Sequence, residues 1–146
     1  MVKHDFKVVT QWKGGRNEIG TVQGDLINEQ ISIPYSLGGQ GIGTNPDEML
    51  VSAASSCYII SLAATLERAG YKDIRINQQS VGTASFENGK FKMECITHYP
   101  KINVDNNHKD NLKKRLLKLL KIAENNCMIS NAIKNNVEVR IEPTLV

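Results

Sequence analysis

The sequence predicts an α+β fold with a mainly antiparallel sheet and two long central helices. Short runs of alternating apolar and polar residues predict strands, and an apolar run over 47–69 predicts the first helix. A leucine stripe over 108–124 predicts the second helix. Because groups of strands are separated by single helices, the order favours helices packed on an antiparallel sheet. We expect one domain over residues 1–146, a common size for a single core.

The first part of the chain predicts three strands and a loop. Residues 6–12 alternate and predict a half-buried strand, which the Gly14-Gly15 turn ends. Residues 20–25 and 30–33 predict two further strands. The glycine-rich stretch 36–43 lacks the Lys-Ser/Thr pair of a phosphate-binding loop, so we expect a mobile connection.

The first helix has a clear start signal. Thr44 or Asn45 can cap it, Pro46 suits its first position, and the carboxylates of Asp47 and Glu48 complement the positive end of its dipole. We expect it to end at residue 69, before a glycine. Its interior carries six small residues over 52–57 and is apolar most of the way round, which predicts a buried helix.

The second half predicts a hairpin, a helix and a last strand. Residues 73–85 and 91–99 read as strands around an Asn88-Gly89 turn, and Pro100 is expected to end the second of them. Residues 101–107 then form a connection. The helix over 108–124 places its leucines on one face and its lysines mostly on the other, and residues 137–141 alternate as a strand.

Composition limits the possible classes of protein. The net charge is +3, and the basic residues of the second helix form a solvated face, so nucleic-acid binding is not expected. The longest apolar run is interrupted by serines and is judged too short and too polar to span a bilayer. The first residues carry no apolar signal segment, so we expect a cytoplasmic protein without a membrane partner.

Three cysteines carry the candidate chemistry. There is no CxxC pair, and His4, His98 and His108 are scattered, so we expect no metal site and no cofactor, and surface or strand positions for the histidines. Cys95 lies in a predicted strand and is interpreted as a core filler. The remaining two cysteines are either structural or redox-active.

Cys57 and Cys127 are placed differently. Cys57 lies inside the apolar helix, beyond the reach of the helix dipole, and burial alone would make its thiol inert, so reactivity would need a nearby cation. Cys127 directly follows the second helix and is expected in an accessible, mobile loop. The two could form a sulfenic acid and then a disulfide, but their spacing in the sequence does not decide this.

Three motifs together resemble the OsmC/Ohr family of osmotically inducible protein C and the organic hydroperoxide resistance proteins. The first is Gly-Thr-Asn-Pro-Asp-Glu-Met-Leu over 43–50, followed by Ser55-Ser56-Cys57. The second is Cys-Met-Ile-Ser-Asn-Ala-Ile over 127–133, and the third is Gly14-Gly15-Arg16. The resemblance covers almost the whole chain.

The resemblance implies a thiol-dependent peroxidase with an OsmC-like fold, built as an intertwined homodimer. Cys57 matches the peroxidatic cysteine and Cys127 the resolving cysteine of the family. Arg16 matches the arginine that lowers the thiol pKa and orients the peroxide. The family usually has Glu after Asn-Pro, where this chain has Asp47, so either Asp47 or the following Glu48 would hold the arginine. A dithiol, such as that of a lipoylated protein, is the reductant that the resemblance implies.

Apolar residues near the motifs favour an organic hydroperoxide as substrate. We expect the approach to Cys57 to be lined by five apolar side chains: Leu37, Leu50, Ile59, Ile60 and Met128. Such a lining gains binding energy from an organic tail and little from hydrogen peroxide. The alternative hypothesis is a non-catalytic protein on the same fold, which binds a small apolar ligand or acts as a redox sensor.

Overall fold

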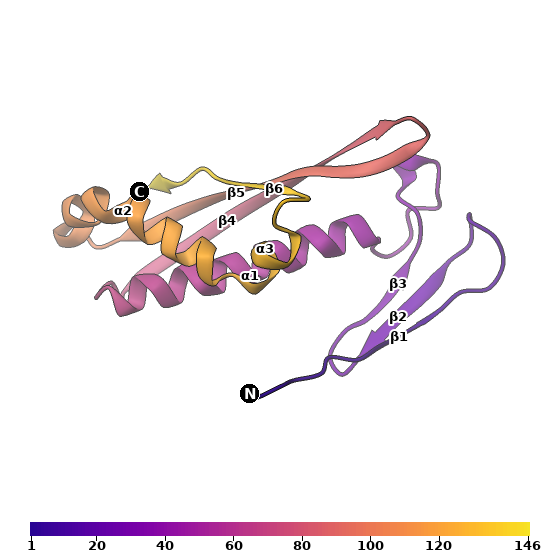
Figure 1. Cartoon of the computed structure of the whole chain (residues 1–146), viewed down its shortest axis with the longest axis horizontal. Helices are drawn as coiled ribbons and strands as arrows, with labels where there is room; N and C mark the ends of the chain where they lie inside the picture. The colour runs from indigo at the N-terminus through magenta and orange to yellow at the C-terminus, as the bar shows by residue number, and fades with distance from the viewer. The chain divides into compact units, whose positions relative to one another are not determined.

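The computed structural model describes residues 1–146, which divide into two compact units. The first unit spans Met1–Met49 and the second Leu50–Val146. The first contains an antiparallel three-stranded sheet, and the second contains a mixed sheet with helices packed against it (Figure 1). The predicted α+β class is therefore confirmed. The single domain over 1–146 stays a prediction.

The first unit consists of three short strands and the glycine-rich loop. Its strands are β1 (Val8–Gln11), β2 (Gly20–Gly24) and β3 (Asn28–Ile31), in the antiparallel order β1-β2-β3. The prediction of a half-buried first strand is wrong, because all four residues of β1 are exposed. Only one face of β2 is buried in this small sheet.

The glycine-rich loop is anchored to the end of β3. Ser32 Oγ donates to the Ile42 carbonyl at 2.7 Å and accepts from the Ile42 N–H at 2.8 Å. Gly43 has a positive φ of 71°, and a Cβ there would lie 2.0 Å from the Gln30 carbonyl oxygen. Glycine is therefore required where the chain passes β3 on its way to the first helix.

Helix α1 (Pro46–Arg68) begins and ends as its signals predict. The Asn45 Oδ1 caps it by accepting from the Glu48 N–H at 2.8 Å, and Pro46 is its first residue. The chain leaves the helix through Gly70, whose φ is +100°. These contacts confirm Asn45, rather than Thr44, as the capping side chain.

The second unit is a long hairpin with helices on one face. Strands β4 (Ile74–Glu87) and β5 (Lys90–Val104) pair antiparallel around Asn88 and Gly89, which both have positive φ, as the Asn-Gly signal predicts. The remaining elements follow in this order: α2 (Asn106–Asn126), α3 (Met128–Ile133), β6 (Glu138–Ile141) and β7 (Thr144–Leu145). Strands β6 and β7 both pair parallel to β5, so the sheet is mixed.

The prediction that Pro100 ends its strand is wrong. Strand β5 continues to Val104, so the expected connection over 101–107 is mostly strand. Pro100 lies between the two stretches of β5 that have a parallel partner: β6 pairs with Cys95–His98, and β7 with Lys101 and Ile102. A residue without an N–H is tolerated there because that side of the ladder is interrupted.

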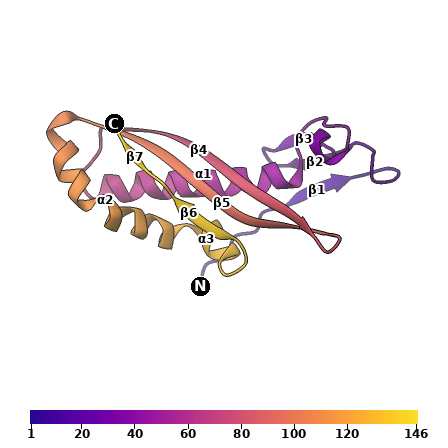
Figure 2. The same ribbon diagram turned by 90° about the horizontal axis from the view of Figure 1, so that it is seen from above.

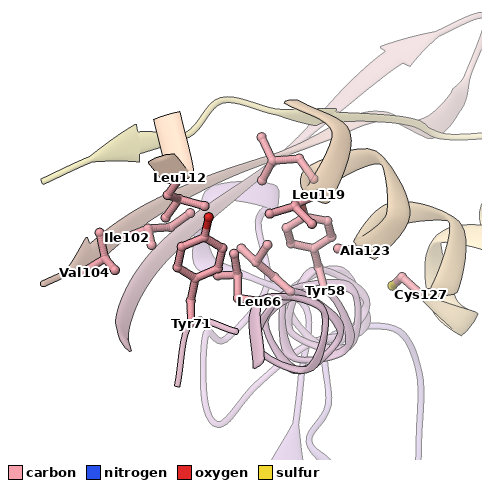
Figure 3. Packing of buried hydrophobic residues seen from close by; sticks show 11 residues of the cluster. Tyr58, Leu66, Tyr71, Ile102, Val104, Leu112, Leu119, Ala123 and Cys127 are labelled. Atoms are coloured by element: carbon pink, nitrogen blue, oxygen red, sulfur yellow. The ribbon is translucent and has the colours of Figure 1, made fainter. Parts of the chain in front are cut away.

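One apolar cluster joins α1, β5 and α2. Tyr58, Leu62 and Leu66 of α1 meet the leucine stripe of α2 over the inward face of β5 (Figure 3). The buried members from β5 and α2 are Ile102, Val104, Leu112, Leu119, Leu120 and Ala123. The predicted amphipathic face of α2 is therefore confirmed. Figure 2 shows α2 running beside α1 in a second view.

Helix α1 is buried on one side only, which corrects the prediction of an all-round buried helix. Ala54, Tyr58 and Leu62 are buried, whereas Ala53 and Ser56 are exposed and Ile60 is 69% exposed. By length and composition alone α1 could also cross a membrane, so the judgement that this run is too short and polar does not stand. Core helices of soluble proteins meet the same criterion.

Two substitutions on α2 test the core. Leu112→Ala, at a fully buried position, is expected to lower the free energy of unfolding by about 2–5 kcal/mol through lost burial and a residual cavity. Leu117→Ala, at a position 80% exposed, is the matched control and should change it by less than about 0.5 kcal/mol. Urea unfolding of both variants measures this, and equal losses would contradict the described packing.

Candidate active site

Helix packing brings Cys57 and Cys127 together. Cys57 lies in the middle of α1, and Cys127 is the single residue between α2 and α3. Cys127 belongs to the buried cluster, beside Ala123 at the end of α2 (Figure 3). Cys57 packs against that same cluster, close enough to Cys127 to raise the pKa of the Cys127 thiol. Both are free thiols in this reduced structure.

The prediction of an accessible, mobile Cys127 is wrong. Its relative exposure is 0%, and its Sγ accepts the Ser130 N–H at 3.5 Å as the N-cap of α3. The short helix α3 had no periodic signal of its own in the sequence. It folds the chain back at once and so encloses the thiol instead of exposing it. Cys57, by contrast, is only half-buried.

The surroundings of Cys127 favour its protonated form. Burial is the main reason that its pKa lies above the ordinary value for a thiol, and the neighbouring Cys57 raises it further. The hydroxyl and the backbone N–H of Ser130 act in the opposite direction and lower the pKa. Cys127 is therefore a neutral thiol at physiological pH, with donors in place for a thiolate.

Arg16, Asp47 and Glu48 belong to the first unit. The Arg16 guanidinium donates to Asn17 Oδ1 at 2.9 Å and to the Leu37 carbonyl at 3.1 Å. Asp47 and Glu48 occupy the first turn of α1, where they meet its positive end. The approach of Arg16 to Cys57, and its support by either carboxylate, stay predictions.

A buried polar network lies on the inward face of the sheet. Gln78 and Ser80 of β4 both bond to the Ser55 hydroxyl, at 3.0 Å and 2.8 Å, and Ser80 Oγ lies 2.6 Å from His98 Nδ1. These residues link α1 to β4 and β5. Ser55, the member on α1, lies two residues before Cys57 in the sequence. Sequence patterns did not reveal the network, although the alternation of β4 would have pointed Gln78 and Ser80 inward.

His98 is fully buried, unlike a surface histidine. Its ring stacks on Tyr58 with centroids 5.1 Å apart, and burial lowers its pKa to about 4. It is therefore neutral at physiological pH. Cys95, expected as a core filler, is half-buried and belongs to neither apolar cluster, so that interpretation is wrong.

The predicted apolar lining is only partly present. Leu50 is half-buried and packs with Ala54, Ile96 and Val137. Ile60 and Met128 are exposed on α1 and α3. Exposed apolar side chains thus occur on α1, which carries Cys57, and on α3, which follows Cys127. Leu50 packs in the core instead.

The chain is an α+β protein in which helices on a mixed sheet hold the half-buried Cys57 beside the buried Cys127. We call this pair of thiols the dithiol site. The family model "OsmC-like protein" matches residues 38–142. The chain therefore belongs to the OsmC/Ohr family, as its three motifs predicted.

Relatives agree with this assignment. The uncharacterized protein YmaD of Bacillus subtilis is 39% identical over 145 residues, which are 99% of this chain and 97% of YmaD. An OsmC-like protein from Vibrio cholerae has a TM-score of 0.79 at 20% identity, covering 97% of this chain and 99% of its own. The organic hydroperoxide resistance protein OhrB of Bacillus subtilis has a TM-score of 0.65 at 24% identity, covering 96% and 98%. At these identities the two solved structures show a shared fold.

The burial of His98 predicts a specific loss of stability in acid. Its pKa is about 4 in the folded chain and near its ordinary 6.5 when unfolded, so the folded state binds fewer protons between these values. Stability is fully present above pH 6.5 and falls as the pH drops towards 4. We expect a loss on the order of 2 kcal/mol at pH 4.5 relative to pH 7.

The His98→Gln variant isolates this contribution from the carboxylates, which also protonate in acid. Urea unfolding at pH 7 and pH 4.5 should show a smaller acid loss in the variant than in the wild type. Equal acid losses in both proteins would refute the assignment of a neutral buried His98.

Proposed function

We propose that the protein is a thiol-dependent peroxidase that reduces organic hydroperoxides to alcohols. The observation that carries the proposal is the pairing of a half-buried Cys57 with a buried, protonated Cys127. A peroxidatic thiol must meet its substrate, and a resolving thiol must lie next to it. Family membership supports the same role, because solved structures with this fold include organic hydroperoxide resistance proteins.

The proposed reaction proceeds in three steps. The Cys57 thiolate attacks the terminal oxygen of ROOH, the O–O bond breaks, and the alkoxide takes a proton to give ROH and a Cys57 sulfenic acid. The Cys127 thiol then attacks that sulfur, which forms the Cys57–Cys127 disulfide and releases water. A dithiol, such as that of a lipoylated protein, restores both thiols and is itself oxidised to a disulfide.

Arg16 supplies the positive charge in this proposal. A guanidinium stays charged and offers several donors, so it can stabilise the Cys57 thiolate and orient the peroxide. Asp47 or Glu48, both in the first turn of α1, is the carboxylate that the family resemblance assigns to holding Arg16. The resemblance to the OsmC/Ohr family supports these roles.

We further propose that the protein is an intertwined homodimer in the cytoplasm. The side of α1 that carries Ala53, Ser56 and Ile60 is exposed in the single chain, although it is composed of small and apolar residues. A second copy would bury this surface, and small residues would allow close approach of the backbones. Met128 of α3 is exposed outside this surface and favours an organic substrate.

Cysteine variants test the proposed activity. Turnover of cumene hydroperoxide with dithiothreitol as reductant should fall by roughly a thousandfold or more in Cys57→Ser, which lacks the nucleophile. In the absence of any reductant, Cys127→Ser should form a sulfenic acid once, trapped by dimedone at Cys57, and then stop. Cys95→Ser is the matched control and should keep its activity.

The substrate class is tested on the wild type. Catalytic efficiency, kcat/KM, should be at least about tenfold higher with cumene hydroperoxide than with hydrogen peroxide, because only the organic tail gains apolar contacts. Equal efficiencies would contradict the substrate assignment. Unchanged thiols after peroxide treatment would instead favour a non-catalytic apolar-ligand binder on this fold.

A further inference from the structure

Regeneration of the disulfide requires a choice between two sulfur atoms. A reducing thiolate can attack Cys57 and expel Cys127, or attack Cys127 and expel Cys57. The rate of each route depends on access to the attacked sulfur and on how well the leaving sulfur carries negative charge. This question rests on the proposed function, which supplies the disulfide. The surroundings of the two cysteines differ in both respects.

Access favours Cys57. Its side chain is half-buried on α1, whereas Cys127 has no exposed surface and is enclosed by α2, α3 and the apolar cluster. An attacking thiolate must approach in line with the S–S bond. The enclosure of Cys127 leaves little room for such an approach.

As a leaving group, Cys127 needs donors to its developing charge, because burial raises its pKa and disfavours the thiolate. Its Sγ already accepts the Ser130 N–H at 3.5 Å. The Ser130 side chain is 6% exposed, and its Oγ is buried without a hydrogen-bond partner in the reduced protein. A buried hydroxyl without a partner costs free energy, so a thiolate that could accept its proton would be stabilised.

We propose that the dithiol reductant attacks Cys57, and that Ser130 is a catalytic residue which stabilises Cys127 as the departing thiolate. The reductant thiolate forms a bond to the Cys57 sulfur as the Cys57–Cys127 bond breaks, and the electron pair leaves on Cys127. The second thiol of the reductant then displaces Cys57, which completes its own disulfide. The Cys127 thiolate takes up one proton to return to the neutral thiol.

Two further observations support this assignment. The Ser130 backbone N–H lowers the pKa of Cys127, in opposition to burial. Ser130 also lines a solvent-open pocket of about 190 Å³ together with Asn125 and Lys121.

The direction of attack can be tested without peroxide. The disulfide is formed with diamide, treated briefly with β-mercaptoethanol, and quenched with N-ethylmaleimide before peptide mapping. We expect the mercaptoethanol adduct on Cys57 and the maleimide on Cys127, with at least about a tenfold preference. An adduct mainly on Cys127 would overturn the proposal.

The role of Ser130 is tested by kinetics. Ser130→Ala should slow reduction of the diamide-formed disulfide by dithiothreitol about 10- to 100-fold, as expected for loss of one hydrogen bond to a charged group. Formation of the Cys57 sulfenic acid should be unchanged, because Cys127 takes no part in that step. Ser130→Thr, which keeps the hydroxyl, should restore the reduction rate.

Ser61→Ala is the matched control. Ser61 Oγ donates to the Ala123 carbonyl at 2.6 Å, so this variant loosens α1 from α2 without removing a donor to Cys127. It should reduce at close to the wild-type rate. Equal slowing in Ser61→Ala and Ser130→Ala, or no slowing in Ser130→Ala, would show that Ser130 has no specific role.

The outcomes separate the two proposals. A diamide disulfide that exchanges at Cys57 in a protein inert to peroxides would leave the inference standing and remove the peroxidase function. Peroxide turnover together with exchange at Cys127 would support the peroxidase function and overturn the inference. If even diamide forms no Cys57–Cys127 disulfide, both proposals fail.

Discussion

The packing of α2 against α1 is the constraint on which the dithiol site depends. The leucine stripe of α2 meets Tyr58, Leu62 and neighbouring residues of α1, and the same cluster continues to Cys127 at the end of α2. Because Cys127 is fixed by the core, its position relative to α1 does not rely on a flexible loop. The contact between the two thiols is a direct consequence of hydrophobic burial, the dominant favourable term in folding.

The same packing makes the two thiols unequal. Cys127 is enclosed, and burial raises its pKa, whereas Cys57 keeps part of its surface exposed. An accessible sulfur suits reaction with substrate and reductant, and a buried protonated sulfur suits a partner that reacts only when its neighbour has been oxidised. Ser130, at the start of α3, supplies the donors that a buried thiolate needs.

Much of the fold could be predicted from short-range signals. Asn45 and Pro46 fixed the start of α1, the Asn88-Gly89 pair fixed the hairpin, and the leucine spacing fixed the buried face of α2. Long-range contacts decided the rest: Pro100 stays in β5 because of where β6 and β7 pair, and Cys127 is buried because six residues after it form a helix. The number of residues between two cysteines does not give their distance in the fold. The pairing of Cys57 with Cys127 was therefore predicted from the family motifs and not from periodicity.

The most direct test of the account is a count of free thiols, with intact mass, before and after one equivalent of cumene hydroperoxide. The chain has three cysteines. The account predicts that three free thiols fall to one, with the loss of two hydrogens and a mapped Cys57–Cys127 disulfide. Three thiols that remain unchanged, or a disulfide that includes Cys95, would contradict it.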